Sequence, residues 1–335
     1  NKVFFIFSPV NIQYMPSSSA PGKVYLFGEH AVVYGEPSIP CAIDKRVHVT
    51  CATSNDHNIA IDAPQADILN FNAPSIEYSI KSNLATVDPK LHYILVAVDL
   101  SLKNSGHSSK GIKLSVKSDI PIGAGIGSSA AVCVATIDAV SRAYGAILSL
   151  EQIADLAYST ECIVQGNASR ADTFCSTMGG TVHVEGSVCR TISSSELFFA
   201  IGYDGGSGPT GELVAMVKSN KEKYPFLDSI IHSIGDLTRI GEIALTNHDI
   251  SSIGELMNLN HGLLTTLGVS SESLDNMVWA SRNSGAIGAK LTGAGGAGCI
   301  VALNPTNSTL PALLSTKTCQ EAFLAKTSRK GLIRH

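Results

Sequence analysis

A glycine-rich loop between two regular segments constrains the fold of this chain more than any other feature. Residues 111–118 alternate apolar and polar side chains, which predicts a half-buried strand. Residues 121–131 follow with the run Pro-Ile-Gly-Ala-Gly-Ile-Gly-Ser-Ser-Ala-Ala. Residues 130–144 are then almost wholly apolar, which predicts a buried helix that ends at Gly145. A strand, a glycine loop and a buried helix in this order form the arrangement needed to wrap backbone around an anion.

The chemistry of this loop favours phosphate. Glycine lets the backbone approach a ligand closely and adopt positive φ. The unpaired N–H groups and the dipole of the following helix attract an anion, and two serine hydroxyls can reach phosphate oxygens or Mg²⁺. No Walker A sequence occurs anywhere in the chain. The alternative is a connector that merely packs helix on strand. The residues expected to bind nucleotide are Pro121, Gly123, Ala124, Gly125, Gly127, Ser128, Ser129 and Ala130.

Three other segments carry side chains of interest, and each is ambiguous alone. Residues 290–299 contain Gly-x-Gly-x-x-Gly, but a strand pattern follows, so a turn that lines a site or a tight hairpin fits better than a Rossmann motif. Residues 20–30 place Lys23 near a strand start, with Glu-His at positions 29 and 30. Glu161 and Asp172 are candidates for the carboxylates that phosphoryl transfer needs. A surface position for Glu161 and an N-cap role for Asp172 are the structural alternatives.

Composition limits the class of protein. The 335 residues predict roughly two domains, and with 44% hydrophobic and 16% charged residues the chain can build a sizeable core. A net charge of −4 and the lack of a basic run exclude a nucleic-acid surface. The eight cysteines form no Cys-x-x-Cys pair, which favours buried thiols in a reducing compartment. The apolar stretch at 2–7 is too short to span a membrane. Residues 1–14 are expected to be an extension before a natural start at Met15, or an edge strand.

The remaining patterns divide the chain near residue 195. Before that point we expect strands at 24–27, 31–34 and 47–52, a helix opened by the capping box Ser149-x-x-Gln152, and a strand at 181–188. After it we expect mainly helices, at 227–240, 253–267 and 271–283, and then a strand at 299–303.

Taken in order, these segments resemble the GHMP kinase family. Residues 20–35 resemble its first motif, in the form typical of members that phosphorylate mevalonate, and residues 121–131 and 290–299 resemble its second and third motifs. The resemblance implies an α+β protein of two domains. Residues 1–195 would form an N-terminal ATP-binding α/β domain of the ribosomal protein S5 domain 2-like type, and residues 196–335 a C-terminal ferredoxin-like domain. It also implies ATP and Mg²⁺ as cofactors and an active site between the domains.

The resemblance also implies roles for individual residues. Asp172 matches the catalytic base, and Lys23 matches the lysine that pairs with it and polarises the acceptor hydroxyl. Ser129 and Glu161 match the Mg²⁺ ligands. The reaction implied is transfer of the ATP γ-phosphoryl group to the 5-hydroxyl of mevalonate, a small-molecule substrate. Residues expected to bind this substrate are Lys23, Glu29, His30, Ser169, Arg170, Asp172, Thr292 and Gly293.

One departure from the family pattern concerns Arg170. The family often has Asn-Pro-Ser-Gly-x-Asp-Asn where this chain reads Asn-Ala-Ser-Arg-Ala-Asp-Thr at 167–173. We hypothesise that the Arg170 guanidinium grips the substrate carboxylate with two hydrogen bonds. A surface or ion-paired arginine is the alternative.

Other assignments within and outside the family are less favoured. A galactokinase normally carries Arg and Asn in the first motif and a sugar-binding stretch that we do not find; homoserine kinases lack the aspartate, and the first motif of phosphomevalonate kinases is less similar. A non-catalytic ligand-binding relative would lack the base, the lysine or the loop serines, all present here. We expect a cytoplasmic protein with no nucleic-acid or membrane partner, and a homodimer is the candidate assembly. A peroxisome-like organelle (glycosome) is the alternative, because Lys23-Val24-(five residues)-His30-Ala31 fits a loose peroxisomal targeting pattern.

Overall fold

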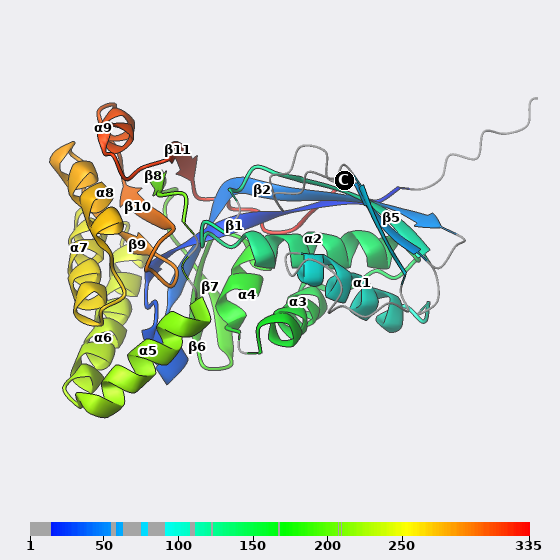
Figure 1. Ribbon diagram of the computed structural model, residues 1–335, viewed down its shortest axis with the longest axis horizontal. Helices are drawn as coiled ribbons and strands as arrows, with labels where there is room; N and C mark the ends of the chain where they lie inside the picture. The colour runs from blue at the N-terminus through cyan, green and yellow to red at the C-terminus, as the bar shows by residue number, and fades with distance from the viewer. Residues whose placement is uncertain are drawn as a thin grey trace, which may run out of the picture.

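The computed structural model describes residues 15–54, 58–62, 75–79, 91–107, 111–121, 123–166, 168–206, 208 and 210–335. The predictions for residues 1–14 lie outside this range. Within it the chain forms two β-sheets, each covered by helices, placed side by side along the long axis (Figure 1). No helix in the described part is long and apolar enough to cross a membrane. The α+β fold expected from the sequence is confirmed.

The larger sheet has eight strands among the described residues, and its main path runs β12-β1-β2-β5-β3-β4. Strand β3 is parallel to β5, whereas the other pairings are antiparallel. The hairpin β6–β7 joins through β2. The strands are β1 (Ser17–Phe27), β2 (Ile39–Ser54), β3 (Asn58–Asp62), β4 (Ser75–Ser79), β5 (Gly111–Ser118), β6 (Thr181–Glu185), β7 (Val188–Ile192) and β12 (Ile333–Arg334).

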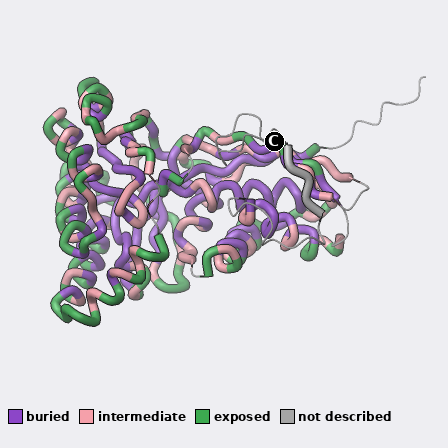
Figure 2. The backbone as a smooth tube through the Cα atoms, viewed as in Figure 1, coloured by how far each residue is buried: buried purple, intermediate pink, exposed green. Residues whose placement is uncertain are grey.

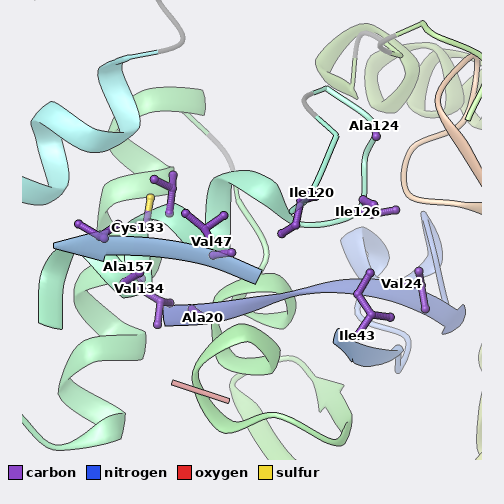
Figure 3. Close-up of a cluster of buried hydrophobic side chains, with 14 of the residues drawn as sticks. Ala20, Val24, Ile43, Val47, Ile120, Ala124, Ile126, Cys133, Val134 and Ala157 are labelled. Atoms are coloured by element: carbon purple, nitrogen blue, oxygen red, sulfur yellow. The ribbon is translucent and has the colours of Figure 1, made fainter. Parts of the chain in front are cut away.

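Helices α1 (His92–Asn104), α2 (Ser128–Ala143), α3 (Leu150–Gln165) and α4 (Arg170–Met178) lie below the larger sheet in Figure 1. Helix α2 is buried from Ala130 to Ser141, because it contacts β1 and β2 on one side and α1 and α3 on the other. Figure 3 shows Cys133 and Val134 of this helix beside side chains of the sheet. Each large apolar side chain buried in this way contributes roughly 1.5–3 kcal/mol. The core therefore fixes the helix whose first residues follow the glycine loop.

The smaller sheet has the order β11-β8-β10-β9 and is antiparallel throughout. Figure 2 shows most of this sheet buried beside helices whose outer faces are exposed, whereas the edge strand β11 is mostly exposed or half-buried. The strands are β8 (Phe198–Tyr203), β9 (Gly288–Thr292), β10 (Cys299–Leu303) and β11 (Glu321–Lys326). The helices are α5 (Thr210–Lys223), α6 (Leu227–Thr246), α7 (Ile250–Thr266), α8 (Glu272–Asn283) and α9 (Thr309–Ser315).

Most predicted elements are present; one is of another type, and one strand differs in extent. Residues 31–34 form the 3₁₀ helix η1 (Ala31–Tyr34) and not a strand, because the chain turns through positive φ at Gly28, His30 and Gly35. The strand expected at 181–188 is the hairpin β6–β7, which turns at Gly186 with φ of 58°. The capping box at the start of α3 is confirmed. The Ser149 hydroxyl accepts from the Gln152 N–H, and Oε1 of Gln152 accepts from the Ser149 N–H.

Candidate active site

The glycine loop before α2 adopts the conformation that its sequence requires. Gly123, Gly125 and Gly127 have φ of 72°, 75° and 80°, in the left-handed region that favours glycine. Gly127 is the N-cap of α2, and no side chain caps the helix. Among the described residues, no side chain therefore accepts from the first-turn N–H groups of α2, which is the state that suits a phosphate ligand.

Lys23 connects this loop to Asp172. Its backbone N–H donates to the Ile126 carbonyl at 2.9 Å, and its ammonium donates to the Gly125 carbonyl at 3.3 Å. The same ammonium lies 3.0 Å from Oδ2 of Asp172. A Cβ at Gly127 would lie only 2.8 Å from Cγ of Lys23, so the loop can approach this side chain closely only as glycine. The structure thus brings the predicted base, the predicted lysine and the loop together.

Asp172 lies in the first turn of α4, where the helix dipole favours a carboxylate. The N-cap is Ser169, whose hydroxyl accepts from the Ala171 N–H at 3.1 Å. The N-cap role considered for Asp172 is therefore wrong, and its side chain is free to project from the helix. That side chain is 25% exposed, whereas the Lys23 side chain is 3% exposed.

Sequence reasoning missed a further partner of Asp172. The Tyr25 hydroxyl donates to Oδ1 of Asp172 at 2.7 Å, and the Lys23 ammonium lies 4.4 Å from the centre of the Tyr25 ring. The available signal was the spacing of two residues between Lys23 and Tyr25, which places both side chains on one face of a strand.

Ser129 and Glu161 form a second pair beside the loop. The Ser129 hydroxyl donates to Oε1 of Glu161 at 2.9 Å, and Glu161 is buried, not at the surface. Burial, and next the negative charge of Asp172, raise the pKa of Glu161 to about 8, against the lowering effects of the Ser129 hydrogen bond and Lys23. A buried carboxylate in this condition is stabilised in its charged form by a cation.

Glu29 and His30, expected to bind substrate, are buried in contacts with the third glycine motif. Glu29 forms an ion pair with Lys290 and accepts from the Asn260 amide at 3.2 Å. His30 donates from Nε2 to the Ala294 carbonyl at 2.8 Å, and burial lowers the pKa of this imidazole. In this structure both side chains therefore join the first motif to the second sheet.

Thr292 and Gly293 lie where the third motif meets the first two. The Thr292 hydroxyl accepts from the Tyr25 N–H at 2.7 Å. A Cβ at Gly293 would lie 3.0 Å from the Gly125 carbonyl oxygen, and one at Gly298 would lie 3.2 Å from that of Ala124. The third motif thus supports the glycine loop from the side of the smaller sheet.

Arg170 points to different partners from those of Asp172. Its guanidinium forms an ion pair with Asp155 and lies 4.5 Å from the centre of the Tyr158 ring, both on α3. Its side chain is 40% exposed. The structure does not bring Arg170 to the Lys23–Asp172 pair, and its role in holding a substrate carboxylate stays a prediction.

Comparisons with known proteins agree with this arrangement. The family model for the N-terminal domain of GHMP kinases matches residues 92–180, and the model for the C-terminal domain matches residues 242–314. A mevalonate kinase of Thermococcus onnurineus is 41% identical over 94% of this chain and 97% of its own length. One of Pyrococcus horikoshii is 42% identical over 94% and 96%. The solved mevalonate kinase of Methanococcus jannaschii has 30% identity and a TM-score of 0.79, covering 96% of this chain and all of that one.

One match corrects a prediction. A galactokinase galactose-binding signature matches residues 17–53, so the expectation that a stretch of this kind is missing was wrong. The matched residues form β1, η1 and almost all of β2, which carry the first motif. A solved galactokinase of Lactococcus lactis is 17% identical with a TM-score of 0.78, which is a likeness of fold.

The loop, the lysine, the aspartate and the third motif thus occur in one site, and the two relatives that are 41% and 42% identical each match 94% of this chain. The family takes ATP as its phosphoryl donor and a small molecule as acceptor. The chain belongs to the GHMP kinase family and, within it, to the mevalonate kinases.

Proposed function

We propose that this enzyme transfers the γ-phosphoryl group of ATP to the 5-hydroxyl of mevalonate and yields 5-phosphomevalonate, a step of isoprenoid biosynthesis. The relatives that are about 40% identical over nearly the whole chain are mevalonate kinases, which supports the acceptor. The observation that carries the chemistry is the 3.0 Å contact between Lys23 and Asp172 beside the glycine loop.

The loop would hold the donor. Backbone N–H groups of residues 123–130 would bind the phosphates, helped by the positive end of the α2 dipole. Asp172 would accept the proton of the attacking hydroxyl, which is a poor nucleophile while protonated. Lys23, which touches both Asp172 and the loop carbonyl of Gly125, would stabilise negative charge on the acceptor oxygen. Most of the rate would come from this positioning.

Ser129 and Glu161 are suited to Mg²⁺. Mg²⁺ prefers oxygen ligands and commonly takes one or two from protein, with the rest from phosphates and water. The two oxygens lie 2.9 Å apart, and the described residues contain no group of three or more His, Cys, Asp or Glu that could hold a metal alone. Glu161 is buried beside Ser129, so a bound cation would offset the cost of keeping this carboxylate charged. Ser129 and Glu161 would hold Mg²⁺, which when bound would supply positive charge to the phosphates of the donor.

The acceptor would lie on the exposed side of Asp172. Ser169 and Arg170 begin the same helix, and Thr292 and Gly293 border the loop from the smaller sheet. Arg170 remains our proposed ligand for the mevalonate carboxylate, which requires that its guanidinium leave Asp155. Glu29 and His30 would contribute to substrate binding indirectly, because their side chains hold the third motif in place.

Three broader features are also proposed. A domain boundary near residue 195 is supported by the sheets, since β7 ends at Ile192 and β8 begins at Phe198. Strand β12 nevertheless returns the chain end to β1.

A cytoplasmic location, with a peroxisome-like organelle as the alternative, is supported by eight free cysteines. A homodimer is a prediction that light scattering in solution would check.

An acceptor panel tests the proposed function. ADP release from ATP and Mg²⁺ would be measured with mevalonate, galactose, phosphomevalonate and homoserine. We expect turnover with mevalonate in the wild type and a loss of at least about a hundredfold in kcat for Asp172→Asn, as general-base catalysis predicts. No mevalonate-dependent ADP release, or faster release with galactose, would overturn the proposal.

A further inference from the structure

Tyr25 connects the catalytic aspartate to the smaller sheet. Its hydroxyl donates to Oδ1 of Asp172 at 2.7 Å, while Lys23 holds Oδ2 of the same carboxylate at 3.0 Å. Each carboxylate oxygen accepts more than one hydrogen bond, so both contacts leave lone pairs for an acceptor hydroxyl. The carboxylate is thereby fixed at two points, one of them a charge and the other a neutral donor.

The backbone of Tyr25 is anchored from the other direction. Its N–H donates to the Thr292 hydroxyl at 2.7 Å, and its carbonyl accepts from the Lys290 ammonium at 3.4 Å. Both partners belong to β9 of the smaller sheet. The register of β1 against β2 shifts on either side of Lys23 to Tyr25, so this stretch is not held by an even strand ladder. The position of the phenol therefore depends on how the two sheets meet.

Apart from its contact with the Lys23 ammonium, the ring of Tyr25 lies among apolar neighbours. It is 7% exposed and packs with Ala171 and Cys175 of α4 in a small apolar cluster. A residue needed only for packing would not carry a hydroxyl there, because a buried hydroxyl costs free energy unless it is bonded. Burial, and then the charge of Asp172, raise the pKa of Tyr25 well above its ordinary value of 10.0, so the hydroxyl remains a donor.

We infer that Tyr25 is a positioning residue for phosphoryl transfer, which holds the Asp172 carboxylate in the orientation that a base requires. The inference rests on the proposed function, in which Asp172 accepts the proton of the substrate hydroxyl. It adds a residue that orients this base through a hydrogen bond between two residues 147 positions apart in the sequence.

The principal test is Tyr25→Phe, which removes the hydroxyl and keeps the ring over Lys23. Hydrogen bonds to charged groups are worth enough to predict a loss of about tenfold or more in kcat, with KM for ATP little changed. Tyr144→Phe is the matched control, since the Tyr144 hydroxyl donates to the Gly111 carbonyl at 2.6 Å, away from Asp172, and we expect near-normal kcat. If the Phe variant does not fold, Tyr25→Leu fills the same position without the hydroxyl.

Two readouts separate positioning from a structural defect. A positioning defect should lower kcat while KM for ATP and the free energy of unfolding stay close to their wild-type values, whereas a structural defect should change all three. The groups that face Asp172 are Lys23 and Tyr25 on β1, Glu161 on α3 and Cys175 on α4, of which only Tyr25 changes.

In a double-mutant cycle, Tyr25→Phe should have little further effect once Asp172 is Asn. Wild-type turnover with an unchanged kcat in Tyr25→Phe, or additive losses in the cycle, would overturn this inference alone. Absence of wild-type turnover would overturn the proposed function and this inference with it.

Discussion

The ammonium of Lys290, on the smaller sheet, forms an ion pair with the carboxylate of Glu29, which follows the last residues of β1 in the larger sheet. Both side chains are almost fully buried. The other two N–H groups of the ammonium are satisfied by the carbonyls of Leu291, at 2.7 Å, and Tyr25, at 3.4 Å. Burial lowers the pKa of Lys290 and raises that of Glu29, and each charge opposes the shift of the other.

Removing one partner of this pair should destabilise the protein strongly. Lys290→Met leaves the Glu29 carboxylate buried without its cation, and breaking a buried pair in this way costs about 3–5 kcal/mol. Lys103→Met is the matched control, because Lys103 pairs with Asp99 on the surface, where such pairs contribute about 0–1 kcal/mol. The measurement is the free energy of unfolding in urea. Equal small losses in both variants would contradict the buried-pair interpretation.

Gly127 should be needed for catalysis as well as for local conformation. Gly127→Ala would put a Cβ 2.8 Å from Cγ of Lys23 at φ of +80°. Gly145 is the control, since its φ is +79° and nothing lies within 4 Å of an added Cβ. Both variants should lose about 1–2 kcal/mol of stability through left-handed strain, but only Gly127→Ala should lose most of its kcat. Steady-state kinetics and thermal unfolding of both variants measure the two effects, and comparable kcat values would show that Lys23 tolerates the displacement.

Glu161 should make stability fall as pH rises. Its folded-state pKa of about 8 lies above its ordinary value of 4.5, so the folded protein keeps a proton that the unfolded chain releases. Between these two values the free energy of unfolding should decrease by up to about 1.4 kcal/mol per pH unit because of this group. Glu161→Gln removes that contribution. The free energy of unfolding of the wild type minus that of the variant, measured in urea without metal at pH 5.5, 6.5 and 7.5, should therefore decrease as pH rises.

The exposed Glu255 on α7 provides the control for this titration. Glu255→Gln makes the same chemical change at an exposed position, so its curve shows the effect of losing one carboxylate there. A wild-type curve parallel to that of Glu161→Gln would refute the assignment.

In the proposed magnesium site, ligation requires the charged carboxylate, so Mg²⁺ with nucleotide should bind more tightly as pH rises toward 8 and release a proton. Calorimetry in two buffers of different ionisation enthalpy measures that proton.

The local parts of the site could be predicted from sequence because each is written in consecutive residues. The loop at 121–131 needs glycines at set positions, and the helix after it needs a continuous apolar run, so both can be recognised without the fold. The capping box at 149–152 is equally local. The pairing of Lys23 with Asp172 followed only from the family resemblance, since no spacing rule connects residues so far apart.

Contacts between residues far apart in the sequence could not be predicted. Tyr25 reads as an ordinary strand aromatic, and its hydroxyl finds Asp172 only because α4 packs on β1. Lys290 has no role predicted from the sequence beyond the glycine motif that it begins, yet it is fully buried because the chain brings it against Glu29, 261 positions away. Residues 31–34 have strand-forming side chains, but the positive φ of three neighbouring positions decides their conformation.

Arg170 supplies the last prediction, because its structural partner and its proposed ligand compete for one guanidinium. The ion pair with Asp155 joins the start of α4 to α3 at the surface, where both side chains are at least 40% exposed and the pair stabilises little. If Arg170 binds the mevalonate carboxylate, Arg170→Met should raise KM for mevalonate about tenfold or more and leave KM for ATP nearly unchanged. Asp155→Asn should then keep or lower KM for mevalonate, because it releases the guanidinium. If both variants instead change the two KM values by similar small amounts, the arginine serves only the ion pair.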